Sequence, residues 1–299
     1  MYVVVFFWGM MLSLVNDKKR ISLILFALTI LLMAFFRYGV GADYFSYMYL
    51  YDRLNINILT EIYSGLDNQE ILFRLFGSVM KYVGAPYQVY ICIIALINIY
   101  FLTKIIKKYS KNPTLSLLLY FSFYYLVWTF SGLRQGITIF VGLYYLLECL
   151  QNRREKKFII IVVFLSLIHV SSIILLLLYY LSKLKFEKKH LVLISIFSLV
   201  VAVLPMGKFI STLSWIPFIN RVIPYISESS LSVSIFDFQT LGRVLFLFLA
   251  LLFYDAYSNK DSISKHIINI YIISLIVYFI FKFSELTAAR LSIYGKILD

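Results

Sequence analysis

The chain has 299 residues, of which 62% are hydrophobic and only 14% are charged. A soluble domain usually carries about a quarter charged residues, so this composition excludes an ordinary soluble protein and predicts an integral membrane protein. The net charge of +13 would favour nucleic-acid binding in a soluble chain, but here many basic residues gather in short loops between apolar segments. Such clusters hold loops on the cytoplasmic side of a membrane, so we attribute the charge to topology and predict no nucleic-acid partner.

Apolar segments long enough to cross a bilayer recur along the chain and predict one all-α transmembrane domain over 1–299, a bundle of about 8–10 spans. The first helix, 1–15, ends at the basic sequence NDKKR, which predicts an external N-terminus. A second helix, 21–36, then leads to the outer face. The acid-rich segment 37–70 is therefore predicted to be an external loop.

The middle of the chain begins with a short segment, 71–84, which contains two basic residues and is predicted to be interfacial or partly inserted. Three spans are predicted after it, at 87–103, 114–130 and 137–150. The sequence SGLRQG between the second and third of these is then a tight external turn.

The apolar segment 158–181 is flanked by strongly basic loops on both sides, which a single span would place on opposite faces. Two half-length helices turning at His169, Ser171 and Ser172 would keep both loops inside. Non-helical backbone at this depth is tolerated where protein buries it or where it lines a wet cavity. We favour this re-entrant hairpin and keep the single span as the alternative.

The remaining spans are predicted at 191–206, 241–257 and 267–283, with a second external loop at 207–240. In the hairpin topology, the polar residues that could carry chemistry gather externally, with one histidine reaching up from mid-membrane: Arg37, Asp43, Arg134, Arg243, Arg290 and His169. The two cysteines lie in apolar segments, and we find no zinc-protease, hydrolase or nucleotide-binding motif. The sequence therefore predicts neither a metal site nor a cofactor.

Arg134 is the most informative basic residue, because it lies in SGLRQG between two apolar spans. An arginine at the edge of a span is costly and normally faces a protein interior or a wet cavity. Gly132 and Gly136 beside it permit close backbone approach. The guanidinium group matches phosphate oxygens, so several external arginines predict a phosphate or pyrophosphate ligand, of which a lipid pyrophosphate is the obvious membrane example. By contrast, four cations are predicted to snorkel to the interface: Arg74, Lys81, Lys208 and Lys282.

Two residues are candidates for proton transfer. Asp43 follows Arg37 beyond a glycine-rich bend, where it could act as a general base on a sugar hydroxyl or form an ion pair that fixes the loop. His169 lies beside Ser171 in an apolar segment, where it could shuttle a proton or bond a phosphate, or serve as a hydrogen-bonded packing residue. Both alternatives stay open for each residue.

Three tyrosines fall at helical spacing after Asp43: Tyr44, Tyr47 and Tyr51. Aromatic faces stack on sugar rings, but tyrosine is also the usual residue of a membrane interface. We interpret these tyrosines as an interfacial belt.

Four sequences in this order, RYGVGADYFSYMYLY, SGLRQGITIFVGLYYL, LIHVSSIILLLLYYL and TAARLSIYG, resemble the signature of the EpsG family of Wzy-type polysaccharide polymerases. The resemblance covers nearly the whole chain. It implies a GT-C-like membrane glycosyltransferase that links oligosaccharide repeat units, carried on undecaprenyl pyrophosphate, into O-antigen, capsule or exopolysaccharide at the external face of the cytoplasmic (inner) membrane. Membrane lipids, and the flippase and chain-length regulator of the same pathway, would be its partners.

The resemblance also implies roles for individual residues. The catalytic positions would be Asp43, Arg134 and His169. The substrate-binding positions would be Arg37, Gly41, Tyr44, Gln135, Ser171 and Arg290, to which the predicted topology adds Arg243. The arginines would stabilise the departing pyrophosphate, and Asp43 or His169 would take the proton of the attacking hydroxyl. Relatives often continue past the late arginine, so a final helix or two is expected to be missing here.

Three other functions remain as alternatives. An O-antigen ligase would use the same donor with a lipid acceptor. A flippase or transporter would need a cavity open alternately to both sides, whereas the polar residues here gather outside. A non-enzymatic component of the export assembly would need none of these residues.

Overall fold

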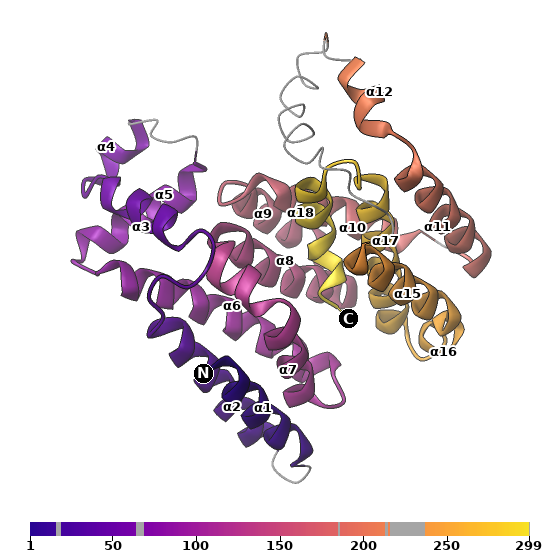
Figure 1. Cartoon of the computed structure of the whole chain (residues 1–299), viewed down its shortest axis with the longest axis horizontal. Coiled ribbons are helices and arrows are strands. Elements are labelled where there is room, and N and C mark those ends of the chain that lie inside the picture. Colours follow the sequence, from indigo (N-terminus) through magenta and orange to yellow (C-terminus); the bar gives the residue numbers. More distant parts are fainter. Residues whose placement is uncertain (16–18, 64–68, 185, 213–214, 216–236, 299) are drawn as a thin grey trace. The chain divides into compact units, whose positions relative to one another are not determined.

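The computed structural model describes residues 1–15, 19–63, 69–184, 186–212, 215 and 237–298. Within these ranges every regular element is a helix and none is a strand (Figure 1). The predicted all-α class is confirmed.

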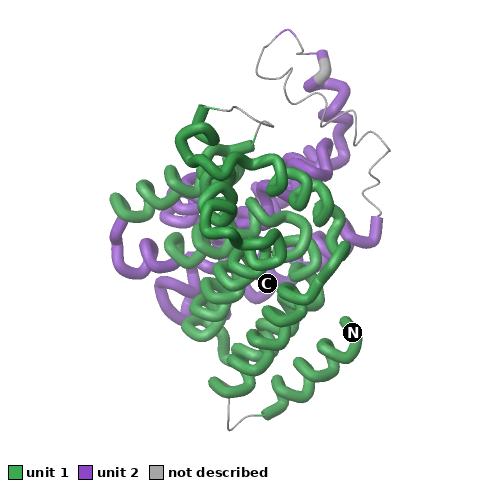
Figure 2. The backbone as a smooth tube through the Cα atoms, turned by 90° about the vertical axis from the view of Figure 1, so that its left-hand side faces the viewer, with its two compact units in different colours: residues 1–146, 155–173 green, residues 147–154, 174–299 purple. Residues whose placement is uncertain are grey.

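The chain divides into two compact units, which are described separately (Figure 2). The first unit consists of Met1–Leu146 and Glu155–Ile173, and the second of Leu147–Arg154 and Ile174–Asp299. The prediction of a single transmembrane domain is not tested by this division and stays a prediction.

Eleven helical elements begin within the described residues of the first unit. In chain order they are α1 (Tyr2–Leu14), α2 (Lys19–Phe35), α3 (Tyr44–Arg53), α4 (Ile58–Tyr63), α5 (Ile71–Tyr82), α6 (Tyr87–Tyr109), α7 (Pro113–Phe123), the π-helical turn η2 (Leu126–Ser131), α8 (Leu133–Asn152), α9 (Glu155–Ser166) and the 3-10 turn η3 (Val170–Ile173). Helices α1, α2 and α7 pack against one another, and α2 also packs against α6. Within its described residues, 37–63 and 69–70, the predicted external loop 37–70 contains the short helices α3 and α4.

The described helices of the second unit are α10 (Ile174–Lys183), α11 (Lys188–Val203), α12 (Met206–Thr212), α15 (Phe238–Leu252), α16 (Tyr254–Ser258), α17 (Ser262–Ile280) and α18 (Glu285–Lys296). Helix α17 is central, because α10, α11, α15, α16 and α18 all pack against it. Every residue from Asn269 to Phe279 is buried, as expected of a helix that is apolar all round. The sequence ELTAAR, which follows the last predicted span, forms the start of α18. Of the predicted loop 207–240, residues 213–214 and 216–236 lie outside the described residues.

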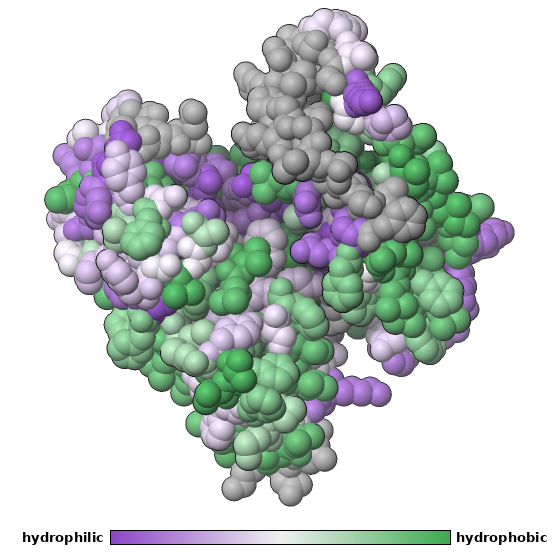
Figure 3. All heavy atoms as spheres, viewed as in Figure 1, coloured by the Kyte–Doolittle hydropathy of each residue, from purple (hydrophilic) through white to green (hydrophobic). Residues whose placement is uncertain are grey.

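Three helices, α6, α8 and α17, are long and apolar enough to cross a membrane, and five shorter apolar helices accompany them in the described part of the chain. Apolar side chains cover much of the visible surface of α1, α2 and α7, whereas polar residues gather around α3 and α4 (Figure 3). Val4 and Phe7 of α1 and Leu28 of α2 are exposed apolar residues. Such a surface suits lipid rather than water. The protein is therefore an all-α membrane protein, while the number of spans and the GT-C likeness stay predictions.

The segment 158–181 is not one continuous helix. Helix α9 ends at Ser166, the turn η3 follows His169, and α10 begins at Ile174. This confirms the predicted interruption at the polar HVSS sequence and excludes one continuous helix over 158–181. The re-entrant course of the two halves and the side of the membrane on which their loops lie stay predictions.

Three tyrosines of α3 lie in the core of the first unit. Tyr44, Tyr47 and Tyr51 share one face of the helix, and none has more than 9% of its surface exposed. They pack with residues of α5, α6 and α8, and the Tyr51 hydroxyl donates a hydrogen bond of 2.6 Å to the carbonyl oxygen of Ala85. The interpretation as an interfacial belt is wrong, because their helical spacing buries this face against neighbouring helices instead.

The predicted snorkelling of Arg74 is also wrong. Its Nη1 donates to the Glu61 carboxylate over 2.8 Å and to the Glu61 carbonyl oxygen over 3.0 Å, and both residues are buried. Glu61 also accepts a hydrogen bond of 2.9 Å from the backbone N–H of Asn55. A buried charge is costly unless it is paired, so this ion pair fixes α4 against α5. In the second unit the buried Lys282 is likewise paired, with Asp237 at 3.0 Å.

Candidate functional site

The loop between α2 and α3 lies against the π-helical turn η2. Gly41 has φ 110°, a conformation that residues with a side chain rarely adopt. A Cβ atom at this position would lie 3.2 Å from the carbonyl oxygen of Phe130. Next to it, the backbone N–H of Ala42 donates to Ser131 Oγ over 3.0 Å. Gly41 therefore permits close packing of the loop on η2, and its predicted contact with substrate stays a prediction.

Arg37 fixes the same loop from within the protein. Its Nη1 donates to the Phe130 carbonyl oxygen over 2.7 Å and to the Val40 carbonyl oxygen over 3.3 Å. The guanidinium carbon lies 4.3 Å from the centroid of the Phe130 ring, at cation–π distance. Burial lowers the pKa of Arg37, although arginine remains cationic in proteins. The contacts of Arg37 are thus those of an anchor, and its predicted role in binding pyrophosphate stays a prediction.

Asp43 begins α3 and is exposed. Among the described residues, its carboxylate forms no hydrogen bond or ion pair, with Arg37 or with any other side chain. The alternative in which Asp43 fixes the loop by pairing with Arg37 is therefore wrong. Arg37 bonds to backbone carbonyl groups instead, because the bend at Gly41 brings η2 to it. The proposed role of Asp43 as a general base stays a prediction.

Arg134 lies in the first turn of α8, directly after η2 and Gly132. The backbone of Gly136 is so close to Trp128 that a Cβ atom would lie 2.2 Å from the Trp128 carbonyl oxygen. The sequence SGLRQG thus forms a helix start rather than the predicted tight turn, while its glycines permit the expected close approach. π-Helical turns are rare and often occur at functional sites. Here the turn ends just before α8, which begins at Leu133, and so places Arg134 in the first turn of that helix.

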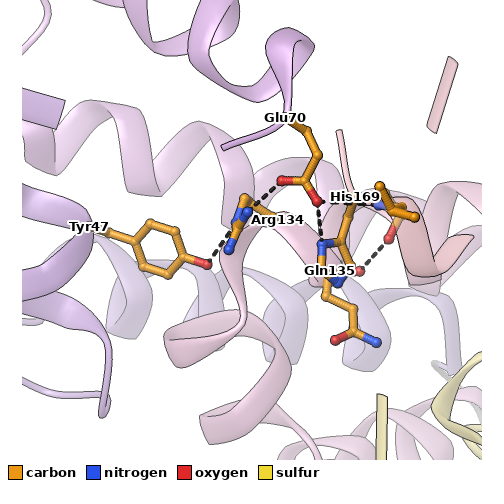
Figure 4. Close-up of polar contacts among 7 residues, drawn as sticks. Tyr47, Glu70, Arg134, Gln135 and His169 are labelled. Atoms are coloured by element: carbon orange, nitrogen blue, oxygen red, sulfur yellow. Dashed lines mark hydrogen bonds and ion pairs between the residues drawn. The ribbon is translucent and has the colours of Figure 1, made fainter. Parts of the chain in front are cut away.

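The side chain of Arg134 is held from two directions (Figure 4). Its Nη1 forms an ion pair with Glu70 Oε2, and its Nε donates to the Tyr47 hydroxyl over 3.4 Å. Its Nη2 donates to no residue in the described part of the chain. Arg134 therefore has a fixed position and retains donor capacity for a bound anion.

His169 is bonded to the other oxygen of the same carboxylate (Figure 4). Its Nδ1 lies 3.0 Å from Glu70 Oε1, and the backbone N–H of Val170 donates to this oxygen over 3.3 Å. The side chains of Arg134, Glu70 and His169 are 20%, 16% and 13% exposed, so the cluster is largely buried and still reachable. The two residues predicted from separate motifs, Arg134 and His169, are thus brought together.

Glu70 is the member of this cluster that the sequence did not predict. Burial raises the pKa of its carboxyl, but the hydrogen bond with His169 and the charge of Arg134 outweigh burial and lower this pKa to about 2. Glu70 is therefore ionised at neutral pH. Its only signal in the sequence was a position immediately before the helix ILFRLFGS, among several other acids of the segment 37–70.

The other predicted site residues of the first unit lie in the same elements. The buried Tyr44 has a hydroxyl 3.1 Å from Gln88 Oε1. Gln135 is buried and follows Arg134 in α8, and Ser171 lies in η3, two residues after His169. Their roles in binding substrate stay predictions.

Arg243 and Arg290 lie in α15 and α18 of the second unit. The guanidinium carbon of Arg243 lies 3.8 Å from the centroid of the Tyr278 ring, and its Nη2 donates to Gln239 over 3.3 Å. Their predicted convergence with Arg37 and Arg134 stays a prediction.

A model of the EpsG family matches residues 20–298. No curated protein and no solved structure matches the chain. The match covers nearly the whole chain, including the segments that contribute Glu70, Arg134 and His169. The chain belongs to the EpsG family, a family of membrane proteins like the Wzy-type polysaccharide polymerases.

Proposed function

We propose that this protein is a glycosyltransferase that polymerises oligosaccharide repeat units carried on undecaprenyl pyrophosphate. The family supports a polymerase-like membrane protein. The observation that carries the proposal is the cluster in which Arg134 and His169 are held by one carboxylate. It combines a cation for a phosphate group with a base for a hydroxyl group, and these are the two functions that glycosyl transfer from a lipid pyrophosphate requires.

Arg134 binds the pyrophosphate of the donor. Its ion pair with Glu70 fixes one edge of the guanidinium group and leaves Nη2 for a phosphate oxygen. Negative charge develops on the pyrophosphate as it departs, so a fixed cation stabilises the transition state more than the ground state. Arg37, Arg243 and Arg290 are further candidates for the same ligand.

The reaction transfers the growing chain to the incoming unit. The bond between the anomeric carbon of the donor and its pyrophosphate oxygen breaks, and the pyrophosphate leaves with the electron pair. A bond forms between that carbon and a hydroxyl oxygen at the non-reducing end of the acceptor. The hydroxyl proton passes to a general base, for which His169 and Asp43 are the candidates.

The predicted topology sets the rest of the proposal. Basic loops hold the protein in the cytoplasmic (inner) membrane with the N-terminus external, so polymerisation occurs at the outer face. The product is an O-antigen, capsule or exopolysaccharide. The flippase that supplies repeat units and a chain-length regulator are the proposed partners.

The test is gel analysis of surface polysaccharide from a deletion strain complemented with wild type, Arg134→Ala or Arg134→Lys. We expect single repeat units to accumulate in the deletion and Arg134→Ala strains. Arg134→Lys should restore little, because lysine cannot form the paired contacts of the guanidinium group. Arg53→Ala, at an exposed arginine of α3, is the matched control and should restore full polymer.

Three outcomes would count against this proposal. Normal polymer from a membrane-inserted Arg134→Ala protein would remove the arginine from the mechanism. Polymer that is complete but stays on its lipid carrier in the deletion strain would indicate a ligase. Lipid-linked repeat units confined to the inner leaflet would indicate a flippase.

A further inference from the structure

We propose that Glu70 is a positioning residue that holds the proton of His169 on Nδ1 and so presents Nε2 as the general base. The inference rests on the proposed function. It selects His169 over Asp43 as the base and assigns a role to a carboxylate that the sequence motifs leave out.

The two oxygens of Glu70 have separate partners. Oε2 pairs with Arg134, while Oε1 faces Nδ1 of His169 at 3.0 Å and accepts the backbone N–H of Val170 at 3.3 Å. An ionised carboxylate only accepts hydrogen bonds, so the hydrogen between Glu70 and His169 must belong to Nδ1. In a neutral imidazole the lone pair is then on Nε2, because the partner of one ring nitrogen determines the state of the other.

The backbone fixes Glu70 against the break in which His169 lies. Glu70 immediately precedes α5, and the N–H of Leu72 donates to the Leu167 carbonyl oxygen over 2.9 Å. Together with the Val170 contact, this bond joins the start of α5 to both sides of His169. The carboxylate is therefore held by the fold itself rather than by a flexible loop.

The charges around His169 are arranged for this role. Glu70 faces the imidazole directly, and Arg134 lies on the far oxygen of Glu70. A His169 that gains a proton from an acceptor hydroxyl becomes a cation, which the adjacent carboxylate stabilises. The hydrogen bond with His169 and the charge of Arg134 lower the pKa of Glu70, so the carboxylate does not itself take up the proton.

Asp43 offers no comparable arrangement. It is exposed, and no side chain in the described part of the chain orients its carboxylate. A general base must be held within hydrogen-bond distance of the proton that it removes. The geometry therefore favours His169.

The kinetic test uses the full chain reconstituted in liposomes with lipid-linked repeat units extracted from the deletion strain. We expect Glu70→Gln to lower kcat by at least about tenfold, within the roughly 10²–10⁴-fold that a general base contributes. KM should stay the same or fall, because the variant lacks the carboxylate charge that opposes the charge of Arg134, so that Arg134 binds an anion no less well. The matched control is Glu61→Gln, which removes a buried carboxylate paired with Arg74 outside the cluster. It should leave kcat per folded molecule unchanged.

A second measurement does not depend on activity. The chain has three histidines, so ¹⁵N-histidine NMR gives few imidazole signals. The other two supply internal references in the described structure. His266 Nδ1 faces the Ser182 carbonyl oxygen at 3.0 Å, which requires Nδ1–H, whereas His190 Nδ1 accepts the Glu187 N–H at 3.4 Å, which requires Nε2–H.

In wild type and in Glu61→Gln, we expect the imidazole ¹⁵N signals of His169 to resemble those of His266, which report the Nδ1–H form. In Glu70→Ala, we expect signals of the Nε2–H form to appear for His169. Difference spectra with His169→Gln assign the signals. An Nε2–H form of His169 in wild type, or unchanged kcat in Glu70→Gln, would overturn the inference while leaving the polymerase proposal standing. Wild-type protein that forms no polymer from these units would instead overturn the polymerase proposal, whatever the state of His169.

Discussion

Arg134 lies in α8 and His169 in the break between α9 and η3, and the two bond to opposite oxygens of the Glu70 carboxylate. Each polar group is costly in an apolar environment, and the shared carboxylate satisfies both. The arrangement also keeps the two groups apart, since the guanidinium group lies at one oxygen of Glu70 and the imidazole at the other.

Gly41→Ala should destabilise the protein by about 1–3 kcal/mol, the cost of a side chain in a sparsely populated backbone conformation, with added strain from the contact at Phe130. The measurement is the thermal midpoint of the purified protein. The matched control is Gly84→Ala, where φ is 72° but no atom lies within 4 Å of the new Cβ. Equal losses in the two variants would show that the approach to Phe130 does not matter.

Arg37→Ala should cost about 1–3 kcal/mol of stability, because the buried carbonyl group of Phe130 and the part-buried one of Val40 lose their donor. Arg37→Lys should recover only part of this, since a lysine cannot both bond these oxygens and stack on the Phe130 ring. Thermal midpoints and the KM for lipid-linked units separate the two roles of Arg37. A higher KM without a lower midpoint would identify Arg37 as a ligand rather than an anchor. Arg53→Ala is the exposed-arginine control.

The sequence predicted well the helices that form because lipid offers the backbone no hydrogen-bond partners. The apolar segments 1–15 and 87–103 correspond to α1 and α6, because a helix is the only way to satisfy backbone groups in lipid over such lengths. Arg134 and His169 could be predicted for the same reason, since a polar residue in an apolar segment is expensive.

The other features of the site and core could be identified only from the three-dimensional structure. Glu70 lies in an acid-rich segment, where one more carboxylate carries no signal, and only the packing of α5 against the break at His169 brings it into the cluster. The buried face of α3 was misinterpreted because a helical spacing of tyrosines is the same for a membrane interface and for a protein core. Arg74 was misinterpreted because its partner, Glu61, lies in a different short helix.

The buried pair of Glu61 and Arg74 yields a prediction about stability alone. Glu61→Gln or Arg74→Met should each cost about 3–5 kcal/mol, because each leaves a buried charge without its partner. The double variant Glu61→Leu with Arg74→Met should recover most of the loss, since it leaves no charge behind. Thermal midpoints in one detergent test this, with kcat per folded molecule as the second measurement. A double variant as unstable as the sum of the singles would show that the pair does not act as a unit.

The ionisation of Glu70 predicts how stability depends on pH. Its pKa in the folded protein is about 2, below the ordinary value of 4.5, so its ionised form is stabilised by folding. This contribution is complete above about pH 4.5 and is lost as the pH falls toward 2. Asp237 of the second unit behaves alike, because the bonds from Thr240 and Lys282 outweigh burial and lower its pKa to about 2.

Unfolding midpoints measured between pH 3 and 7 should therefore fall steeply in wild type and less steeply in Glu70→Gln or Asp237→Asn, with the flattest profile in the double variant. Because the two carboxylates share no bonding partner in the described structure, their effects should add. A Glu70→Gln profile that parallels wild type through the acid range would mean that Arg134 and His169 do not hold this carboxylate in its ionised form.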